Sequence, residues 1–235
     1  IVFEDADLDN AVSAAMMANW YSNGQVCSNG TRIFVHESIM ADFVDRLVER
    51  TKKLRIGDPS CMETDIGPMV HQDQFEKVLR YVDIGREEGA TLLHGGTRVH
   101  DLPDVLKDGY FLTPAIFTNC TDEMTICNEE VFGMLMSILS FSSEEEAISR
   151  ANNTEFGLAA GVFTKDIQRA HRVVAALQAG VTYINNYNLA PMNLPWGGTK
   201  HSGIGRENGI ESVNSWTQQK SVYVEMGNVQ CEYPR

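Results

Sequence analysis

The chain has 235 residues, of which 43% are hydrophobic and 22% are charged, as in folded globular proteins and unlike disordered or coiled-coil sequences. Asp and Glu outnumber Lys and Arg by 32 to 19, which gives a formal net charge of -13. This excess argues against a surface for nucleic acid or anionic membranes, because both attract positive charge.

The chain opens on Ile1-Val2-Phe3, an apolar run without an initiator Met that resembles the middle of a strand. We therefore expect the natural chain to begin further upstream. A strand is predicted at 33–36, and Ser38 can cap a helix whose apolar side chains recur near a 3.6-residue period. That helix ends at the turn signal at 57–59, and a second helix is expected from about 75 to 89.

Strands and helices continue to alternate beyond that point. Ser143 and Glu146 have the spacing of a capping box, which opens a helix. The expected elements are strands at 91–93, 135–141, 157–164 and 181–185, and helices at 143–150 and 166–177. This order predicts an α/β fold with a mostly parallel sheet covered by helices. Ser221 to Met226 is predicted as one isolated strand, which invites pairing outside its own domain.

The cysteines are odd in number and contain no CxxC pair: Cys27, Cys61, Cys120, Cys127 and Cys231. This pattern predicts free thiols in a reducing, cytoplasmic compartment, and it predicts no metal site. No apolar run approaches the roughly 18 residues that a membrane helix needs, and no signal peptide is visible. We expect no membrane and no nucleic acid among the partners.

The first motif with chemical content is the loop 23–30, Asn-Gly-Gln-Val-Cys-Ser-Asn-Gly, between a predicted helix and a strand. Glycines on both sides of Cys27 let the backbone approach a ligand and leave the thiol exposed on a turn. A thiolate is a strong nucleophile, and a neighbouring backbone N–H can hold an oxyanion. The alternative is a structural, buried cysteine, which is the common state of a free thiol.

Two further motifs follow in the chain. The segment 128–133, Asn-Glu-Glu-Val-Phe-Gly, places adjacent carboxylates before an aromatic ring, a set that can hold a ribose diol and stack on a ring. Its alternative is a solvated acidic turn ahead of a core Phe. The segment 194–207 is rich in glycine, which indicates close contact with backbone or ligand. It lacks the GxGxxG context of a dinucleotide fingerprint.

Together, and in this order, the three motifs resemble the aldehyde dehydrogenase superfamily. GQVC is similar to its nucleophile loop, EEVFG to its nicotinamide-side motif and PWGGTKHSGIGRE to its late glycine-rich loop. The resemblance covers essentially the whole chain. The sequences NNYN at 185–188 and QRAHRVVAALQAG at 168–180 are most similar to the trimethylaminobutyraldehyde and betaine aldehyde dehydrogenase branch.

The resemblance implies a domain organisation. Residues 1–210 would form the aldehyde dehydrogenase catalytic domain, and residues 211–235 would form a tail whose strand joins subunits in a homo-oligomer, either a dimer or a tetramer. The resemblance also implies that the N-terminal NAD-binding domain of the family is absent from this chain. In this family a Glu-Leu-Gly-Gly motif with the general base, and the asparagine of the oxyanion hole, also lie upstream of the residues present here.

The resemblance also implies roles for individual residues. Cys27 falls on the nucleophile, and Glu207 on a second catalytic carboxylate that handles water and protons. Glu130, Phe132 and Leu158 fall on positions that contact the nicotinamide end of the cofactor. The expected reaction oxidises an aldehyde to a carboxylic acid through a thiohemiacetal and a thioester. NAD is the expected cofactor, and the residues that would distinguish it from NADP lie upstream.

Three aromatic residues, Tyr21, Tyr187 and Trp196, fall on the substrate tunnel, which favours betaine-like, trimethylamino- or amino-aldehydes. Some positions depart from the family: Met134 stands where Pro is usual, and Trp20 and Trp196 replace the commoner Phe. One alternative is a non-catalytic half-enzyme that acts by assembling with other subunits. A second is a thiol hydrolase in which His36, His71 or His201 serves Cys27 as base.

Overall fold

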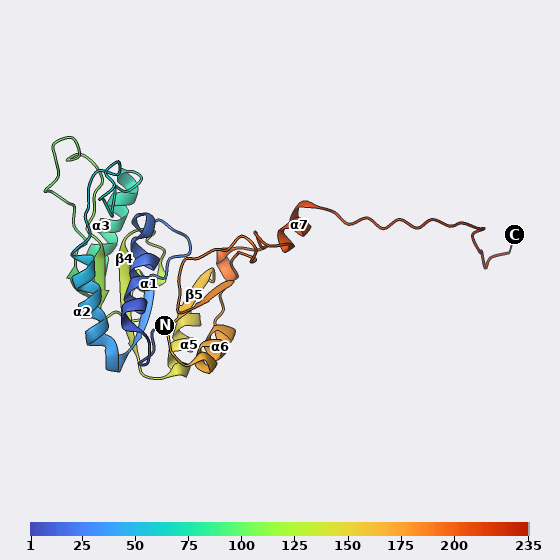
Figure 1. Ribbon diagram of the computed structural model, residues 1–235, viewed down its shortest axis with the longest axis horizontal. Helices are drawn as coiled ribbons and strands as arrows, with labels where there is room; N and C mark the ends of the chain where they lie inside the picture. The colour runs from blue at the N-terminus through green and yellow to red at the C-terminus, as the bar shows by residue number, and fades with distance from the viewer. Residues whose placement is uncertain (235) are drawn as a thin grey trace.

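A computed structural model describes residues 1–234 (Figure 1). The helices are α1 (Leu8–Trp20), α2 (Met40–Thr51), α3 (Gln72–Glu87), α4 (Thr125–Asn128), α5 (Glu144–Asn152), α6 (Ile167–Ala176) and α7 (Glu211–Trp216), with 3₁₀ turns at Tyr21–Gly24, Glu37–Ile39 and Lys200–Ser202. The strands are β1 (Arg32–His36), β2 (Thr91–His94), β3 (Ala115–Thr118), β4 (Leu135–Phe141), β5 (Ala159–Val162) and β6 (Val181–Ile184).

The strands form a four-stranded sheet in the order β1-β4-β3-β2 and a parallel pair, β5-β6. Val2 connects the two, because it makes parallel bridges to Val35 of β1 and to Phe163 after β5. Backbone hydrogen bonds hold this segment, including Val2 N–H to Phe34 O at 2.8 Å and Phe3 N–H to Phe163 O at 3.0 Å. Only β2 runs antiparallel to its neighbour. The prediction of a mostly parallel sheet is confirmed, and the start of the chain is extended backbone within it.

The core is built on β4, which lies between β1 and β3. Six of its seven residues are buried, Ser140 being the exception, and five of the seven are apolar, as expected for a parallel strand that is covered on both faces. The helices α5 and α6 pack together beside β5 and β6, whereas α2 and α3 contact β1 and β2 (Figure 1). Phe3 meets Phe141 of β4 edge to face at 5.3 Å, which ties the first residues to the sheet.

The helix at 143–150 begins where the capping motif predicts. Ser143 Oγ accepts the N–H of Glu146 at 3.2 Å. The second hydrogen bond of the capping box differs from the ideal motif. The Glu146 carboxylate accepts the backbone N–H of Ser142 at 2.9 Å rather than that of Ser143. Arg150 then reaches Glu146 and Asp122, so the last turn of this helix is also fixed by charge.

The tail is predicted to pair outside its own domain, and the described chain holds no partner for it. Ser221 to Met226 pairs with no other segment within residues 1–234 and is not a strand there, because a strand requires a hydrogen-bonded partner. Its side chains are exposed, as in Tyr223 at 96%. After α7 the chain extends away from the body of the protein (Figure 1).

Within the described residues, no helix is both long and apolar enough to cross a lipid bilayer.

Candidate active site

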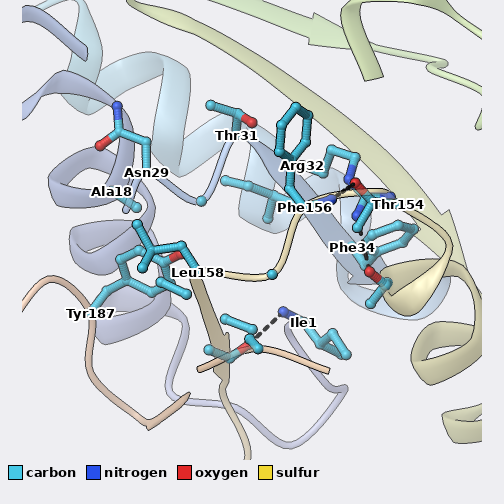
Figure 2. A pocket seen from close by; sticks show the side chains of 18 of the residues that line it. Ile1, Ala18, Asn29, Thr31, Arg32, Phe34, Thr154, Phe156, Leu158 and Tyr187 are labelled. Carbon is cyan, nitrogen blue, oxygen red and sulfur yellow. Dashed lines mark hydrogen bonds between the residues drawn. The ribbon is translucent and has the colours of Figure 1, made fainter. Parts of the chain in front are cut away.

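A cavity of about 240 Å³ lies at the amino-terminal edge of the sheet. The loops that line it precede β1, β4 and β5 in the chain, and parallel strands bring the segments before them to a common edge. It is lined by five of the eight site residues predicted from sequence: Cys27, Glu130, Phe132, Leu158 and Tyr187. Ala18, Leu158 and Tyr187 lie on one side of it, and Arg32 and Phe156 on the other (Figure 2).

Cys27 is exposed on a tight turn. The Asn29 N–H donates to Val26 O at 3.2 Å, and the Asn29 side-chain amide donates to Gly24 O at 2.8 Å, which closes the turn around the thiol. Gly24 has φ +70 and lies directly against the backbone of Gly133. A side chain there would be strained and would collide with that backbone, so glycine is required where the two loops meet.

The loop that contains Glu130 is held by one face of α3. Gln74 Nε2 donates to Val131 O at 3.0 Å and to Phe132 O at 2.6 Å, and Lys77 Nζ donates to Glu130 O at 2.8 Å. Phe132 has φ 59, a left-handed conformation that costs a residue other than glycine about 1–3 kcal/mol. The bonds from Gln74 help to offset this cost and fix the half-buried Phe132 at the cavity.

The two adjacent carboxylates of this loop have different surroundings. Glu129 accepts a hydrogen bond from Tyr81 Oη at 2.5 Å, and this bond, together with burial, raises the pKa of Tyr81 to about 12. The side chain of Glu130 is exposed and makes no hydrogen bond or ion pair with any residue in 1–234. The structure therefore leaves the Glu130 carboxylate available at the cavity to accept hydrogen bonds from a diol.

Tyr187 is the one predicted substrate residue that lines the Cys27 cavity. Its ring fits against Gly30 and Gly161, where an added Cβ would lie 2.9 Å from ring atoms in each case. Burial raises the pKa of Tyr187, with a smaller contribution from Tyr183, whose ring centroid is 5.2 Å away. Tyr21 is 57% exposed and lies outside the cavity, so the predicted aromatic residues do not form one group.

Trp196 and Glu207 lie in a neighbouring open depression. Their backbones pair through two hydrogen bonds of 2.7 Å, from Trp196 N–H to Glu207 O and from Glu207 N–H to Trp196 O. The Glu207 side chain is exposed. Leu158 and Ser202 border both the depression and the Cys27 cavity, so the two spaces adjoin. Glu207 is thus placed beside the thiol cavity rather than in it.

Several residues that line the cavity belong to none of the three sequence motifs. Four alanines of α1 form one wall, with the i, i+3, i+4, i+7 spacing of a helix face: Ala11, Ala14, Ala15 and Ala18. That spacing is the sequence signal from which this wall of the cavity could have been predicted. Arg32 also lines the cavity, and its guanidinium donates to Arg150 O at 3.2 Å and to Ala151 O at 3.0 Å. Nothing in the sequence pattern indicates those carbonyl partners.

None of the histidines lines the Cys27 cavity within the described chain. His71 caps α3 by accepting Gln74 N–H at 3.2 Å, and His201 pairs with Glu155 at 3.1 Å. His36 Nδ1 lies 2.8 Å from Ser38 Oγ. The thiol hydrolase interpretation needs a base beside the sulfur, and this geometry does not provide one.

Across residues 1–234 no three His, Cys, Asp or Glu side chains form a group suited to a metal ion.

The Aldehyde dehydrogenase family matches residues 1–222. The chain belongs to the aldehyde dehydrogenase family. It is 57% identical over 233 residues to a betaine aldehyde dehydrogenase of Brucella anthropi, covering 99% of this chain and 47% of that protein. A betaine aldehyde dehydrogenase of Mesorhizobium japonicum is 54% identical over 235 residues, with the same coverage. The chain thus spans about half the length of these curated relatives.

Two solved aldehyde dehydrogenases have the same fold. A Bacillus cereus aldehyde dehydrogenase in complex with NAD+ is 44% identical, with a TM-score of 0.91 over 96% of this chain and 45% of that one. A Staphylococcus aureus betaine aldehyde dehydrogenase in complex with NAD+ is 41% identical, with a TM-score of 0.88 over 92% of this chain and 42% of that one. The family and the fold inferred from sequence are confirmed.

Proposed function

We propose that this chain is the catalytic part of an NAD-dependent aldehyde dehydrogenase, and that the complete enzyme oxidises aldehydes to carboxylic acids through Cys27. The observation that carries the proposal is the shared cavity, which is lined by the exposed Cys27 turn and by Glu130 and Phe132. Residues 1–210 would be the catalytic domain and 211–235 its tail. The five free cysteines support a reducing, cytoplasmic location.

Cys27 performs the covalent chemistry in this proposal. Its thiolate adds to the aldehyde carbon, a C–S bond forms, and the carbonyl oxygen becomes an oxyanion. The backbone N–H of Cys27 donates to no acceptor within residues 1–234, so it can donate to that oxyanion. After oxidation the acyl group remains on Cys27 as a thioester, and water releases it as the acid. Glu207, in the adjoining depression, is proposed to handle water and protons.

The residues present fit one end of a nicotinamide cofactor. Glu130 offers a carboxylate without a side-chain partner, Phe132 a half-buried ring and Leu158 an apolar side chain, all at the cavity of Cys27. When bound, NAD supplies the acceptor for the hydride that leaves the thiohemiacetal carbon. The NAD+ complexes of the two solved relatives support this cofactor over NADP.

Limited labelling with iodoacetamide tests the assignment of the nucleophile. Cys61 and Cys231 are exposed like Cys27, whereas Cys120 and Cys127 are buried. The hydrogen bond with Cys127, together with burial, raises the pKa of the Cys120 thiol and keeps it protonated. In the complete enzyme, peptide mass spectrometry should show that loss of turnover follows modification of Cys27. Inactivation that instead follows modification of Cys61, with Cys27 unmodified, would contradict the proposal.

The proposed substrates are betaine-like trimethylammonium or amino aldehydes. A quaternary ammonium over an aromatic face gains roughly 0.5–2 kcal/mol, and the Tyr187 side chain lines the cavity. The names of the two relatives support this class. Tyr187→Ala should lower kcat/KM for betaine aldehyde about 2- to 30-fold more than for an isosteric neutral aldehyde. Equal losses for the two substrates would leave Tyr187 as a general apolar wall.

The tail is proposed to join subunits of a dimer or a tetramer. Val222 and Val224 alternate with Tyr223 and Glu225, and the segment is exposed throughout. An unpaired strand-like segment of this kind can extend the sheet of a second copy. Light scattering of the complete enzyme with and without residues 221–235 should show a smaller assembly after truncation. An unchanged assembly would exclude this role for the tail.

A further inference from the structure

The side chain of Asn188 connects three segments that are distant in sequence. Asn188 directly follows Tyr187, and its Oδ1 accepts a hydrogen bond from Ser28 Oγ at 2.8 Å. Its Nδ2 donates to the carbonyl of Met17, near the end of α1, at 3.1 Å. Ser28 directly follows Cys27 and is 5% exposed. The Asn188 side chain thus joins the segment of Tyr187 to Ser28, the residue that follows Cys27.

Hydrogen-bond chemistry fixes the orientation of this amide. The Met17 carbonyl can only accept, so the NH₂ group of Asn188 must face it. Oδ1 is then directed at Ser28, and the Ser28 hydroxyl must be the donor. The backbone of Asn188 is left-handed, with φ 57, a conformation that asparagine tolerates better than most residues. Backbone and side chain therefore both favour asparagine at this position.

We propose that Asn188 is a positioning residue that holds the Cys27 turn in place relative to the Tyr187 side of the cavity. The inference rests on the proposed role of Cys27 as nucleophile. The other side-chain bonds of this loop run from Asn19 of α1 to Gly30 O at 3.2 Å and from Asn23 and Gln25 to the backbone of residues 68–70, or stay within the loop through Asn29. Within residues 1–234, the Asn188 side chain provides the side-chain bond that joins the turn to the segment after β6.

The expected consequence is catalytic rather than structural. The sulfur must approach an aldehyde carbon that is held from the Tyr187 side, and misplacing reacting groups by 1 Å can cost about 10²-fold in rate. Loss of the bond between Ser28 and Asn188 should lower kcat of the complete enzyme by about 10-fold. It should also change the rate and pH profile of Cys27 alkylation, because the turn that presents the thiol would no longer be held.

Asn188→Gly and Ser28→Ala test this inference in the complete enzyme. Glycine keeps the left-handed backbone and removes the whole side chain with its bonds to Ser28 and Met17, and alanine removes the Ser28 hydroxyl. Each variant should show the lower kcat and the altered Cys27 alkylation, and the double variant should be no worse than either single one. Asn119→Gly is the matched control, because Asn119 is also left-handed, with φ 54, and its side chain donates to Thr91 Oγ1, away from the cavity.

The outcomes separate this inference from the proposed function. If Cys27→Ser abolishes turnover but Asn188→Gly keeps the wild-type kcat and Cys27 alkylation profile, the positioning role is wrong. Losses that are additive in the double variant would also overturn it, since the two side chains would then act independently. If Cys27→Ser retains turnover, the proposed function itself fails.

Discussion

Replacing Cys27 with alanine in the complete enzyme is expected to lower kcat by on the order of 10⁴-fold or more. The reason is that no other described nucleophile lies where Cys27 lies. Cys127 also lines the cavity, but it is buried within the core, whereas Cys27 is exposed on the turn. Without the thiolate no thiohemiacetal forms, and no acyl group can be held for hydrolysis. Steady-state kinetics with a fixed aldehyde and NAD measure the loss.

Cys61→Ala is the control for this substitution. Cys61 is exposed, as Cys27 is, but it lies in a polar turn after α2 and does not line the cavity. The control variant should keep the wild-type kcat. A Cys27→Ala enzyme that retains more than about a tenth of wild-type turnover would show that aldehyde oxidation proceeds without this thiol.

The helices and strands that were predicted correctly from the sequence are those with a strong local signal, such as an apolar run or a helix cap. Five of the seven residues of β4 are apolar, and its predicted bounds, 135–141, match the structure. The helix after Ser143 has a cap that identifies its start. Where these local signals are present, the order of strands and helices leaves few alternatives to a mostly parallel sheet.

β3 has no such signal and was missed. It is four residues long, Ala115–Thr118, and follows Pro114, so its pattern is too short to distinguish a strand from a loop. Its place beside β4 comes from tertiary pairing, in which Ile116 is in register with Met136. The strand predicted in the tail, with a partner outside its own domain, stays a prediction. Ser221 to Met226 has the alternation of a strand, but a strand also needs a partner, and the described chain provides none.

In the candidate site, too, the sequence does not predict contacts between residues that are distant in the chain. Motif resemblance predicted which residues carry chemistry, but not which of them share one cavity. Tyr21 and Tyr187 were placed together as tunnel residues, yet only Tyr187 lines the cavity of Cys27. The separation of Glu207 from that cavity depends on its backbone pairing with Trp196, which sequence spacing does not predict. The bond between Ser28 and Asn188 spans 160 residues and has no local signature.

A protein made of these 235 residues alone is expected to show no measurable NAD-dependent aldehyde oxidation. The expectation rests on the family resemblance, which implies that the general base and the second oxyanion donor lie outside these residues. Loss of a general base typically costs about 10²–10⁴-fold, and loss of one oxyanion donor roughly 10²–10³-fold. These factors need not multiply, because groups that act as a unit are not additive.

Cofactor binding adds a stronger constraint on the isolated chain. Glu130 and Phe132 can contact one end of a nicotinamide cofactor, but the rest of the cofactor would have to be held by a domain outside these residues. Mixing the purified chain with a separately expressed N-terminal half that carries Glu-Leu-Gly-Gly should restore turnover where the two halves dock. Docking without turnover would favour the non-catalytic half-enzyme. Robust oxidation by the chain alone, with its mass confirmed, would show that the base and the cofactor site are both present within residues 1–235.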